Sequence, residues 1–198
     1  MRGLTRTRRT LQTGLLALAV GLIAGSSANA AQAQGSSKIH IKNFGQMDEH
    51  FYRGAQPAEG DYKDLAALGI KTIIDLRDDP TSYAKREAES AGLRYVNIPM
   101  SDSATPRDEQ IEQFLKLAAD PATGSFYVHC AGGRHRTGVM GAVYRMNHDG
   151  WDFDKAYKEM KAYDFYTRWG HGALKDYVKD YGSAKAINVS TGSSGANR

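Results

Sequence analysis

The sequence predicts a single α/β domain whose central, mostly parallel sheet is flanked by helices. Helical and strand-like segments alternate through the middle of the chain, as they do in domains built on parallel strands. Residues 38–182, about 145 in number, lie between two ends of different composition, and this is the usual length for one hydrophobic core. We find no internal repeat and no pattern that indicates a second domain.

The expected strands are short runs rich in β-branched and aromatic residues. Three of them cover residues 71–77, 94–100 and 125–129. An earlier pair, residues 38–42 and 51–53, is expected to extend the sheet as an antiparallel edge.

Six helices are expected, and they are placed by apolar residues at helical spacing. The third shows this best, because Ile111, Phe114 and Leu115 share one face and Thr105-Pro106 precede them as expected N-cap and first-turn proline. Beyond residue 182 this periodicity stops, and residues 183–198, rich in Ser, Gly, Ala and Asn, are predicted to be a disordered tail. The expected helices are 58–68, 82–91, 106–119, 136–148, 152–163 and 172–181.

Residues 1–30 have the pattern of an export signal. Four arginines precede an apolar run at residues 15–24, and small residues at 28–30 follow it. The run is shorter than the ~20 residues that a membrane-spanning helix needs. We therefore expect cleavage after Ala30, a periplasmic or secreted product and no stable membrane insertion. The pair Arg8-Arg9 leaves export by the twin-arginine route open beside the general one.

Removal of that signal abolishes the net positive charge of the chain. Residues 1–30 hold four of the 26 basic side chains and none of the 22 acidic ones, so 22 of each sign remain. A neutral domain has no general attraction for nucleic acid, and we expect no nucleic-acid partner.

Cys130 is the one cysteine of the chain, so no intramolecular disulfide can form. It ends a strand-like run, and a Gly-containing loop and a helix start follow it. In such a loop successive backbone N–H groups converge on an anion, and the helix dipole adds to the attraction. Gly132 and Gly133 allow the close backbone approach that this geometry requires.

Nucleophilic chemistry explains why a cysteine stands at this point. A free thiol has a pKa of ~8.5, but a helix N-terminus and a nearby cation lower it to ~3.5 to 7.5. Arg136 can hold two phosphate oxygens with its planar fork and stabilise the charge of the transition state. We therefore predict a phosphatase that works through a phosphocysteine intermediate.

Residues 129–138 read His-Cys-x5-Arg-Thr-Gly, which resembles the phosphate-binding signature of protein tyrosine and dual-specificity phosphatases. The resemblance implies that Cys130 is the nucleophile and Arg136 the oxyanion clamp. It also implies that the hydroxyl of Thr137 stabilises the thiolate as a leaving group and that His129 orients the loop through a hydrogen bond. The implied substrate-binding positions are Ala131, Gly132, Gly133, Arg134 and His135.

A narrower resemblance, over about residues 50–148, is to the atypical dual-specificity phosphatases of plant and fungal type. It is carried by residues 134–138, 52–57 and 71–77. Some members of that branch act on inositol pyrophosphates, which implies that a non-protein substrate is an alternative to a phosphorylated protein.

The same family uses an aspartate upstream of the cysteine to protonate the leaving group. Asp102 lies 28 residues before Cys130, and we prefer it as the general acid. Asp108 is the rival, but its expected place in the first turn of a helix already explains a carboxylate there.

Other polar and aromatic residues receive structural interpretations. Turn chemistry at Gly54 and Pro57 accounts for Arg53 and Gln56. Three acids near a strand end, Asp75, Asp78 and Asp79, are expected to cap the next helix. An aromatic cluster is expected to pack beneath a loop rather than line the pocket: Tyr163, Phe165, Tyr166 and Trp169. The histidines show no paired spacing, so we expect no metal and no cofactor.

Three functions remain as hypotheses. The first is a protein tyrosine or dual-specificity phosphatase, and the second is a phosphatase for inositol phosphates or phosphoinositides, which Arg134 and His135 favour. The third is a non-catalytic module that binds phosphorylated ligands. The cysteine and the aspartate speak against it, because binding alone requires neither a thiolate nor a general acid. The substrate is thus a phosphorylated protein or a small phosphorylated metabolite, and the oligomeric state is left open.

Overall fold

A computed structural model describes residues 39–193 of the chain, with side chains described up to Ala184. The predicted signal at residues 1–30 lies outside these residues. Within them, no helix combines the length and the apolar character needed to cross a bilayer.

Five strands form one sheet in the order β1-β2-β5-β3-β4. Only β1 and β2 pair antiparallel, and the other neighbours are parallel. The expected strands were thus found at nearly the predicted positions, and the fold class is confirmed. The strands are β1 (Gly45–Gln46), β2 (Phe51–Ala55), β3 (Thr72–Arg77), β4 (Arg94–Met100) and β5 (Phe126–Cys130).

The antiparallel edge was predicted correctly, but its partner strand was wrong. In the described part of the chain residues 45–46 pair with β2, because Asp48 closes a tight turn directly before that strand, and Lys42 accepts only a single backbone hydrogen bond from Ala55. Its carboxylate accepts hydrogen bonds from the backbone N–H groups of His50 and Phe51, both at 2.8 Å.

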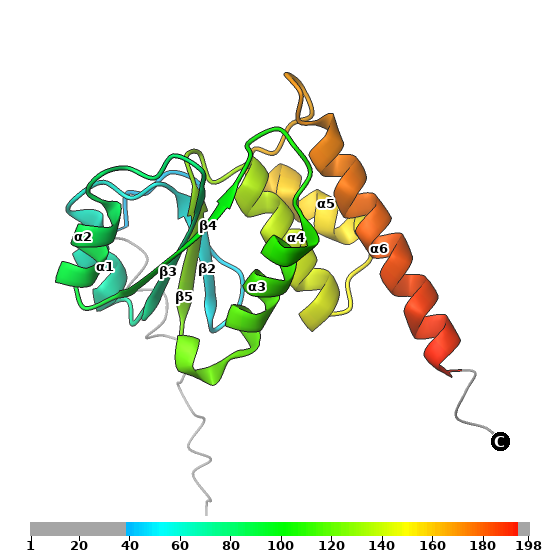
Figure 1. Ribbon diagram of the computed structural model, residues 1–198, viewed down its shortest axis with the longest axis horizontal. Coiled ribbons are helices and arrows are strands. Elements are labelled where there is room, and N and C mark those ends of the chain that lie inside the picture. Colours follow the sequence, from blue (N-terminus) through cyan, green and yellow to red (C-terminus); the bar gives the residue numbers. More distant parts are fainter. Residues whose placement is uncertain (1–38, 194–198) are drawn as a thin grey trace, which may run out of the picture.

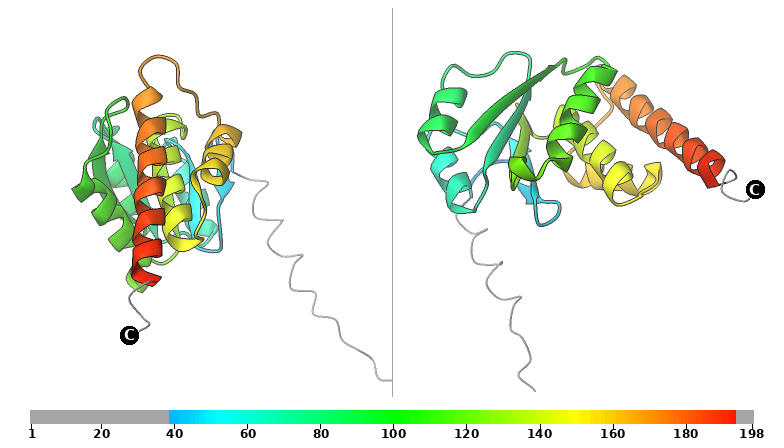
Figure 2. Two further views of the ribbon diagram at one scale, coloured as in Figure 1. Left: turned by 90° about the vertical axis from the view of Figure 1, so that its right-hand side faces the viewer. Right: turned by 60° about the horizontal axis from the view of Figure 1, so that its bottom comes forward.

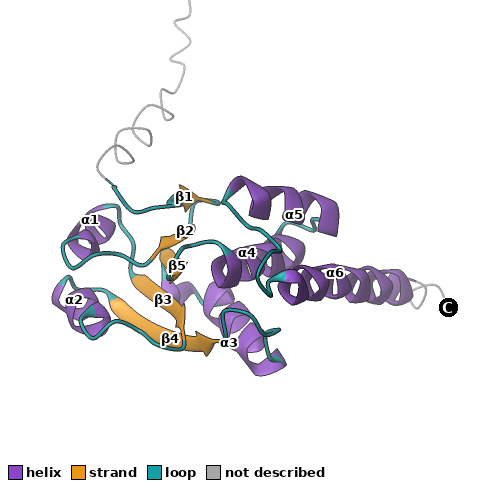
Figure 3. Ribbon diagram, turned by 90° about the horizontal axis from the view of Figure 1, so that it is seen from above, coloured by secondary structure: helices purple, strands orange, loops and turns teal. Residues whose placement is uncertain are grey.

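Helices cover both faces of the sheet, as Figure 3 shows from above. The first two pack on one face, and the remaining four pack on the other. Ile73 and Ile74 illustrate the alternation in β3, since the first enters the smaller core and the second the larger one. The helices are α1 (Asp61–Ala67), α2 (Ala84–Ser90), α3 (Asp108–Ala119), α4 (His135–His148), α5 (Phe153–Ala162) and α6 (Gly172–Ser193), and a short 3₁₀ turn, η2 (Pro121–Thr123), follows α3.

Several helix ends differ from the prediction, and α1 and α2, for example, begin at residues 61 and 84 instead of 58 and 82. Helix α3 begins after Arg107, so Thr105 and Pro106 belong to the preceding loop. The backbone N–H of Arg107 donates to the side chain of Gln110 at 2.8 Å, and the Gln110 amide in turn donates to the carbonyl of Pro99. Gln110 therefore joins the end of β4 to the start of α3 and closes the loop between them.

Helix α6 is longer than predicted, because it continues to Ser193 instead of ending near residue 181. It packs against α4 and α5 and extends past them (Figure 1; Figure 2). Gly182 is a packing position within this helix: an added Cβ would lie 3.3 Å from the side chain of Met146 on α4. The expected disordered tail is thus helical as far as Ser193, and residues 194–198 lie outside the described part.

Candidate active site

The carboxyl ends of the parallel strands bring the predicted site residues together. In the sheet register Ala55 lies beside Cys130 and Asp75 beside His129. The loops after β2, β3, β4 and β5 therefore leave the sheet at one edge, where open α/β sheets bind their ligands.

At this edge a cavity of about 220 Å³ opens over the cysteine. Cys130 itself is only 4% exposed, but it lines the cavity and is reached through it. All but one of the predicted substrate-binding positions also line the cavity, and the exception is Gly133. The lining residues are Asp102, Cys130, Ala131, Gly132, Arg134, His135, Arg136, Tyr166 and His171.

The surroundings of Cys130 favour its thiolate. Burial alone would raise the pKa of this thiol, but hydrogen bonds from the side chain and backbone of Thr137, the charge of Arg136 and the backbone of Arg134 outweigh it. The pKa of Cys130 is consequently lowered from its usual value. Thr137 Oγ1 is buried and has no nitrogen or oxygen partner among the described residues, so it is available to the sulfur of Cys130.

The loop after β5, residues 131–134, is called the phosphate loop below. Three of its consecutive carbonyl groups accept hydrogen bonds from neighbouring segments. The backbone N–H of Gln56 donates to Ala131 O at 3.3 Å. The side chain of Asn43 donates to Gly132 O at 2.8 Å, and Arg53 Nη2 donates to Gly133 O at 2.7 Å. Because the carbonyls point outward, the intervening N–H groups are turned toward the sulfur and the cavity.

Arg53 was therefore misjudged, since its side chain supports the site, whereas Gln56 contributes only its backbone N–H. Arg53 is 1% exposed, and its guanidinium stacks on Tyr163 at 4.0 Å from the ring centre. Sequence reasoning missed Asn43, whose backbone has a positive φ of 53° that presents its amide to the loop. No local pattern marks Asn43, because its partner lies 89 residues away.

Gly133 is required by the packing of the loop against β2. Its φ is +66°, and an added Cβ would lie 2.4 Å from the backbone carbon of Gly54. At Gly132 an added Cβ would meet only the side chain of Arg134, at 3.7 Å. The two neighbouring glycines thus have different tolerance for a side chain.

Arg136 is buried with its guanidinium held from one side. Its Nη1 donates to Asp78 at 2.7 Å and to the carbonyl of Met100 at 2.9 Å. Among the described residues no acceptor binds its Nη2 or Nε, so these groups are free to hold two phosphate oxygens. The role of Arg136 as the oxyanion clamp stays a prediction that this arrangement allows.

The acids near the end of β3 do not cap α2, and that expectation was wrong. Tyr83 is the N-cap of α2 and makes no capping hydrogen bond with its side chain. Asp78 pairs with Arg136, and Asp79 pairs with Arg77 at 3.0 Å. The buried Asp75 accepts hydrogen bonds from the Tyr95 hydroxyl at 2.7 Å and from the backbone N–H of Arg77 at 2.9 Å.

Of the two candidate general acids, only Asp102 lines the cavity. Its loop is held at both ends by Gln110, and its own carbonyl oxygen lies 3.0 Å from Nδ1 of His171. Asp108 lies in the first turn of α3, where its charge acts on Tyr177. The geometry therefore favours Asp102 over Asp108.

His129 is fully buried, and the hydrogen bond expected of it stays a prediction, with the backbone of Cys130 as its candidate partner. Neither ring nitrogen has a partner of normal geometry among the described residues, and Nδ1 lies 3.7 Å from Asp75. Burial lowers the pKa of His129 to about 4, although Asp75 acts in the opposite direction. The neutral ring packs against Tyr127 and supports the strand end below Cys130.

The mouth of the cavity contains two stacked histidines that the sequence pattern did not pair. The rings of His135 and His171 are 3.5 Å apart and nearly parallel, at 12°. Burial, with a further contribution from His171, lowers the pKa of His135 to about 4. Arg134 lies 3.9 Å from Asp164 at the same rim.

The aromatic cluster is divided between packing and the cavity. Phe165 is buried, as expected, and Tyr163 lies on Arg53. Tyr166, however, lines the cavity, and Trp169 is 77% exposed, so both differ from the prediction. The loop that carries them, residues 163–171, connects α5 and α6 and borders the cavity with Tyr166 and His171.

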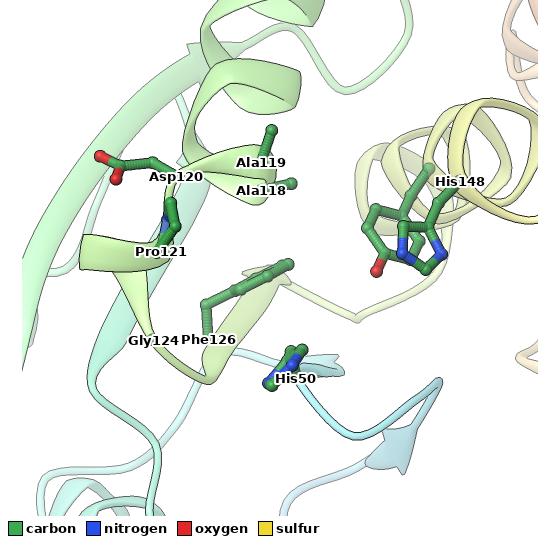
Figure 4. A pocket seen from close by; sticks show the side chains of 9 residues that line it. His50, Ala118, Ala119, Asp120, Pro121, Gly124, Phe126 and His148 are labelled. Atoms are coloured by element: carbon green, nitrogen blue, oxygen red, sulfur yellow. The ribbon is translucent and has the colours of Figure 1, made fainter.

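A second cavity, of about 330 Å³, lies at the opposite end of β5 (Figure 4). It is bordered by His50, Phe126 and His148, and the carboxylate of Asp120 points away from it. This cavity has neither a cysteine nor an arginine, so it lacks the groups that the predicted chemistry needs. No cluster of three metal-binding side chains occurs in the described part of the chain.

Substitutions at the two glycines test the geometry of the phosphate loop. Gly133→Ala should abolish the binding of inorganic vanadate, because its Cβ would displace β2 or distort the ring of N–H groups. Gly132→Ala, the matched control, should bind vanadate within about threefold of the unchanged chain, since its Cβ finds ordinary contact distance. Isothermal titration of both variants makes the comparison, and equal affinities would contradict the loop geometry described above.

Comparison with known proteins identifies phosphatases among the relatives of this chain. A family model described as a DSP-PTPase phosphatase fused to NAD⁺ kinase matches residues 28–171. The probable chloroplastic NAD kinase 2 of rice is 35% identical over 48% of this chain, which is 10% of its own length. The dual-specificity phosphatase TpbA of Pseudomonas aeruginosa is 29% identical over 60% of this chain and 53% of its own. The inositol diphosphatase DSP4 of Arabidopsis thaliana is 27% identical over 58% and 61%.

Solved structures share the fold. TpbA in complex with phosphotyrosine has a TM-score of 0.57 and 23% identity over 73% of this chain and 90% of its own. The core catalytic domain of the phosphatase Siw14 from Saccharomyces cerevisiae has a TM-score of 0.63 and 19% identity over 77% and 94%. This chain spans a tenth of the rice protein and about half of TpbA. Because the family model covers more than half of the sequence, the chain belongs to the cysteine-based, dual-specificity-type phosphatases that this model describes.

Proposed function

We propose that this phosphatase hydrolyses phosphate monoesters through a phosphocysteine intermediate formed on Cys130. The observation that carries the proposal is the cavity in which Cys130, with its lowered pKa, lies among Arg136, Asp102 and the phosphate loop. A lowered thiol pKa supplies the nucleophile, and the outward carbonyls leave N–H groups for the phosphate oxygens.

The reaction has two steps. In the first, the Cys130 thiolate attacks phosphorus, the bond from phosphorus to the ester oxygen breaks, and Asp102 donates a proton to the departing alkoxide. In the second, water attacks the phosphocysteine, Asp102 takes the proton of that water, and the thiolate leaves with the Thr137 hydroxyl beside it. Arg136 holds the equatorial oxygens in both steps.

For the substrate we propose phosphotyrosine or another phosphorylated side chain of a protein. The charge at the cavity supports this choice, because Asp78 and Asp164 pair with Arg136 and Arg134. With Asp102 also present, three carboxylates face two guanidinium groups, and His135 is neutral near pH 7. This balance suits a single phosphate better than a ring with many phosphates. Tyr166 offers an aromatic face to a phosphotyrosine ring.

An inositol pyrophosphate is the second candidate substrate. The Arabidopsis relative is named an inositol diphosphatase, which supports this candidate. Arg134 is the residue at the rim that would contact a second phosphate, because its side chain is 29% exposed and its ion pair with Asp164 is long, at 3.9 Å.

The mechanism predicts a specific pattern among acid and nucleophile variants. Cys130→Ser should abolish turnover while it preserves the binding of phosphate. Asp102→Asn should slow the hydrolysis of an alkyl phosphate by ~10²- to 10⁴-fold, but should affect p-nitrophenyl phosphate much less, because p-nitrophenolate leaves without a proton. Asp108→Asn is the control and should leave both rates unchanged. Steady-state turnover measurements decide, and normal turnover of the serine variant would refute the mechanism.

The choice of substrate is tested with a panel of phosphotyrosine, phosphoserine and phosphothreonine peptides beside inositol pyrophosphates. We expect kcat/KM to be highest for phosphotyrosine peptides, and Tyr166→Ala to lower that value by about tenfold through a higher KM. Arg134→Gln should have little effect on peptides. A preference for inositol pyrophosphates that Arg134→Gln removes would replace the first candidate with the second.

We also propose that the protein is exported, which the signal-like pattern of residues 1–30 supports. Expression of the full chain in a bacterium that carries both export routes should yield a shortened periplasmic or secreted protein that begins at Ala31. Amino-terminal sequencing of that protein measures the cleavage point. A full-length product in the cytoplasm would refute the proposal.

A further inference from the structure

Arg53 is a buried cation for which the described residues provide no carboxylate partner. It lies in β2, it is 1% exposed, and it is among the largest fully buried side chains. No acid in the part of the chain whose side chains are described lies within ion-pair distance of it. The acid that acts on it most strongly, Glu159, is bound to Arg145 at 2.8 Å. A buried charge without a partner is costly, so another anion should offset it.

The contacts of this guanidinium direct it toward the phosphate loop. Its Nη2 donates to Gly133 O at 2.7 Å, its Nε has no partner, and its planar group lies on the Tyr163 ring. On its other side Gly141 of α4 leaves room, since a Cβ there would lie 3.4 Å from Nη1. The guanidinium is therefore fixed beneath the loop, opposite the side from which substrate enters.

Cys130 is one of the groups whose negative charge acts on Arg53. Burial lowers the pKa of Arg53, while the charges of Tyr163, Glu159, Cys130 and Tyr127 act in the opposite direction. Of these groups, Glu159 is already bound to Arg145, whereas Cys130 has a lowered pKa and no ion-pair partner among the described residues. The charge of Cys130 thus acts on Arg53 across the loop whose carbonyl at Gly133 the guanidinium binds.

We propose that Arg53 is a positioning residue that acts through Cys130. It holds the phosphate loop from below by its bond to Gly133, and its fixed positive charge favours the thiolate before substrate arrives. This inference rests on the proposed function, because it assigns a role in activating the same nucleophile.

The test uses the alkylation of Cys130 by iodoacetamide, which reports a single site because the chain has one cysteine. Arg53→Gln keeps a donor for Gly133 O but loses the charge. Its alkylation rate at about pH 6 should fall by roughly three- to tenfold, whereas the rate at about pH 9 should equal that of the unchanged chain. Arg53→Lys keeps the charge and should retain the pH profile.

Asn43→Ala is the matched control, because it removes a neutral donor to the next carbonyl, Gly132 O. It should weaken vanadate binding without a change in the pH profile of alkylation. The other charged and titratable groups that face the thiol or Arg53 are the same in all of these variants, so they cancel in the comparison. They are Asp102, Tyr127, His129, Arg134, His135, Arg136, Glu159, Tyr163, Tyr166 and His171.

A folded Arg53→Gln protein with the unchanged pH profile would overturn the inference. If that variant does not fold, Arg53→Met, which keeps the length of the side chain without its charge, decides: slower alkylation at about pH 6 with an unchanged rate at about pH 9 supports the inference, and an unchanged profile overturns it. The proposed function is judged separately, because it fails only if Cys130→Ser retains turnover. Neither result with Arg53 changes that judgement.

Discussion

The phosphate loop between β5 and α4 depends on the outward binding of its carbonyl groups. A loop of consecutive peptides presents N–H groups to one point only if the carbonyls on the same peptides find acceptable partners elsewhere. Here Gln56, Asn43 and Arg53 supply those partners in sequence, for Ala131, Gly132 and Gly133. With the carbonyls satisfied, the amides of Arg134 and Thr137 are free to lower the pKa of the thiol.

The sheet order explains how these partners reach the loop. Strand β2 lies directly beside β5, and β3 lies on its other side. Arg53 and Gln56 therefore reach the loop from one neighbour, and Asp78 reaches Arg136 from the other. The close approach of β2 also explains Gly133, because the loop backbone packs directly on Gly54 without space for a Cβ.

The charges around the cysteine fall into two groups with different partners. Arg136 and Arg134 line the cavity and face acids at the rim, so a bound phosphate can compete with Asp78 and Asp164 for them. Arg53 lies beneath the loop and has no such acid among the described residues. The first group can bind substrate, whereas the second acts on the nucleophile before and after the substrate is bound.

Much of the fold and the centre of the site could be predicted from the sequence. The parallel sheet, its strands and the first five helices follow from periodicity, which is a local property. The order of strand, Cys130, Gly-containing loop, Arg136 and helix defines a phosphate cradle within nine residues, from 130 to 138, since the backbone itself builds it.

The residues that complete the site depend on contacts between distant segments. Asn43 and Gly132 are 89 residues apart, Arg53 and Gly133 are 80 apart, and His171 and Asp102 are 69 apart. Local turn chemistry accounted for Arg53 well enough that its role in the site was missed, and no pattern marked His171. The sequence by itself determined the candidate nucleophile and the loop around it because these are contiguous in the chain. Only the tertiary structure decided which side chains hold that cradle, because strand order and packing bring them to it.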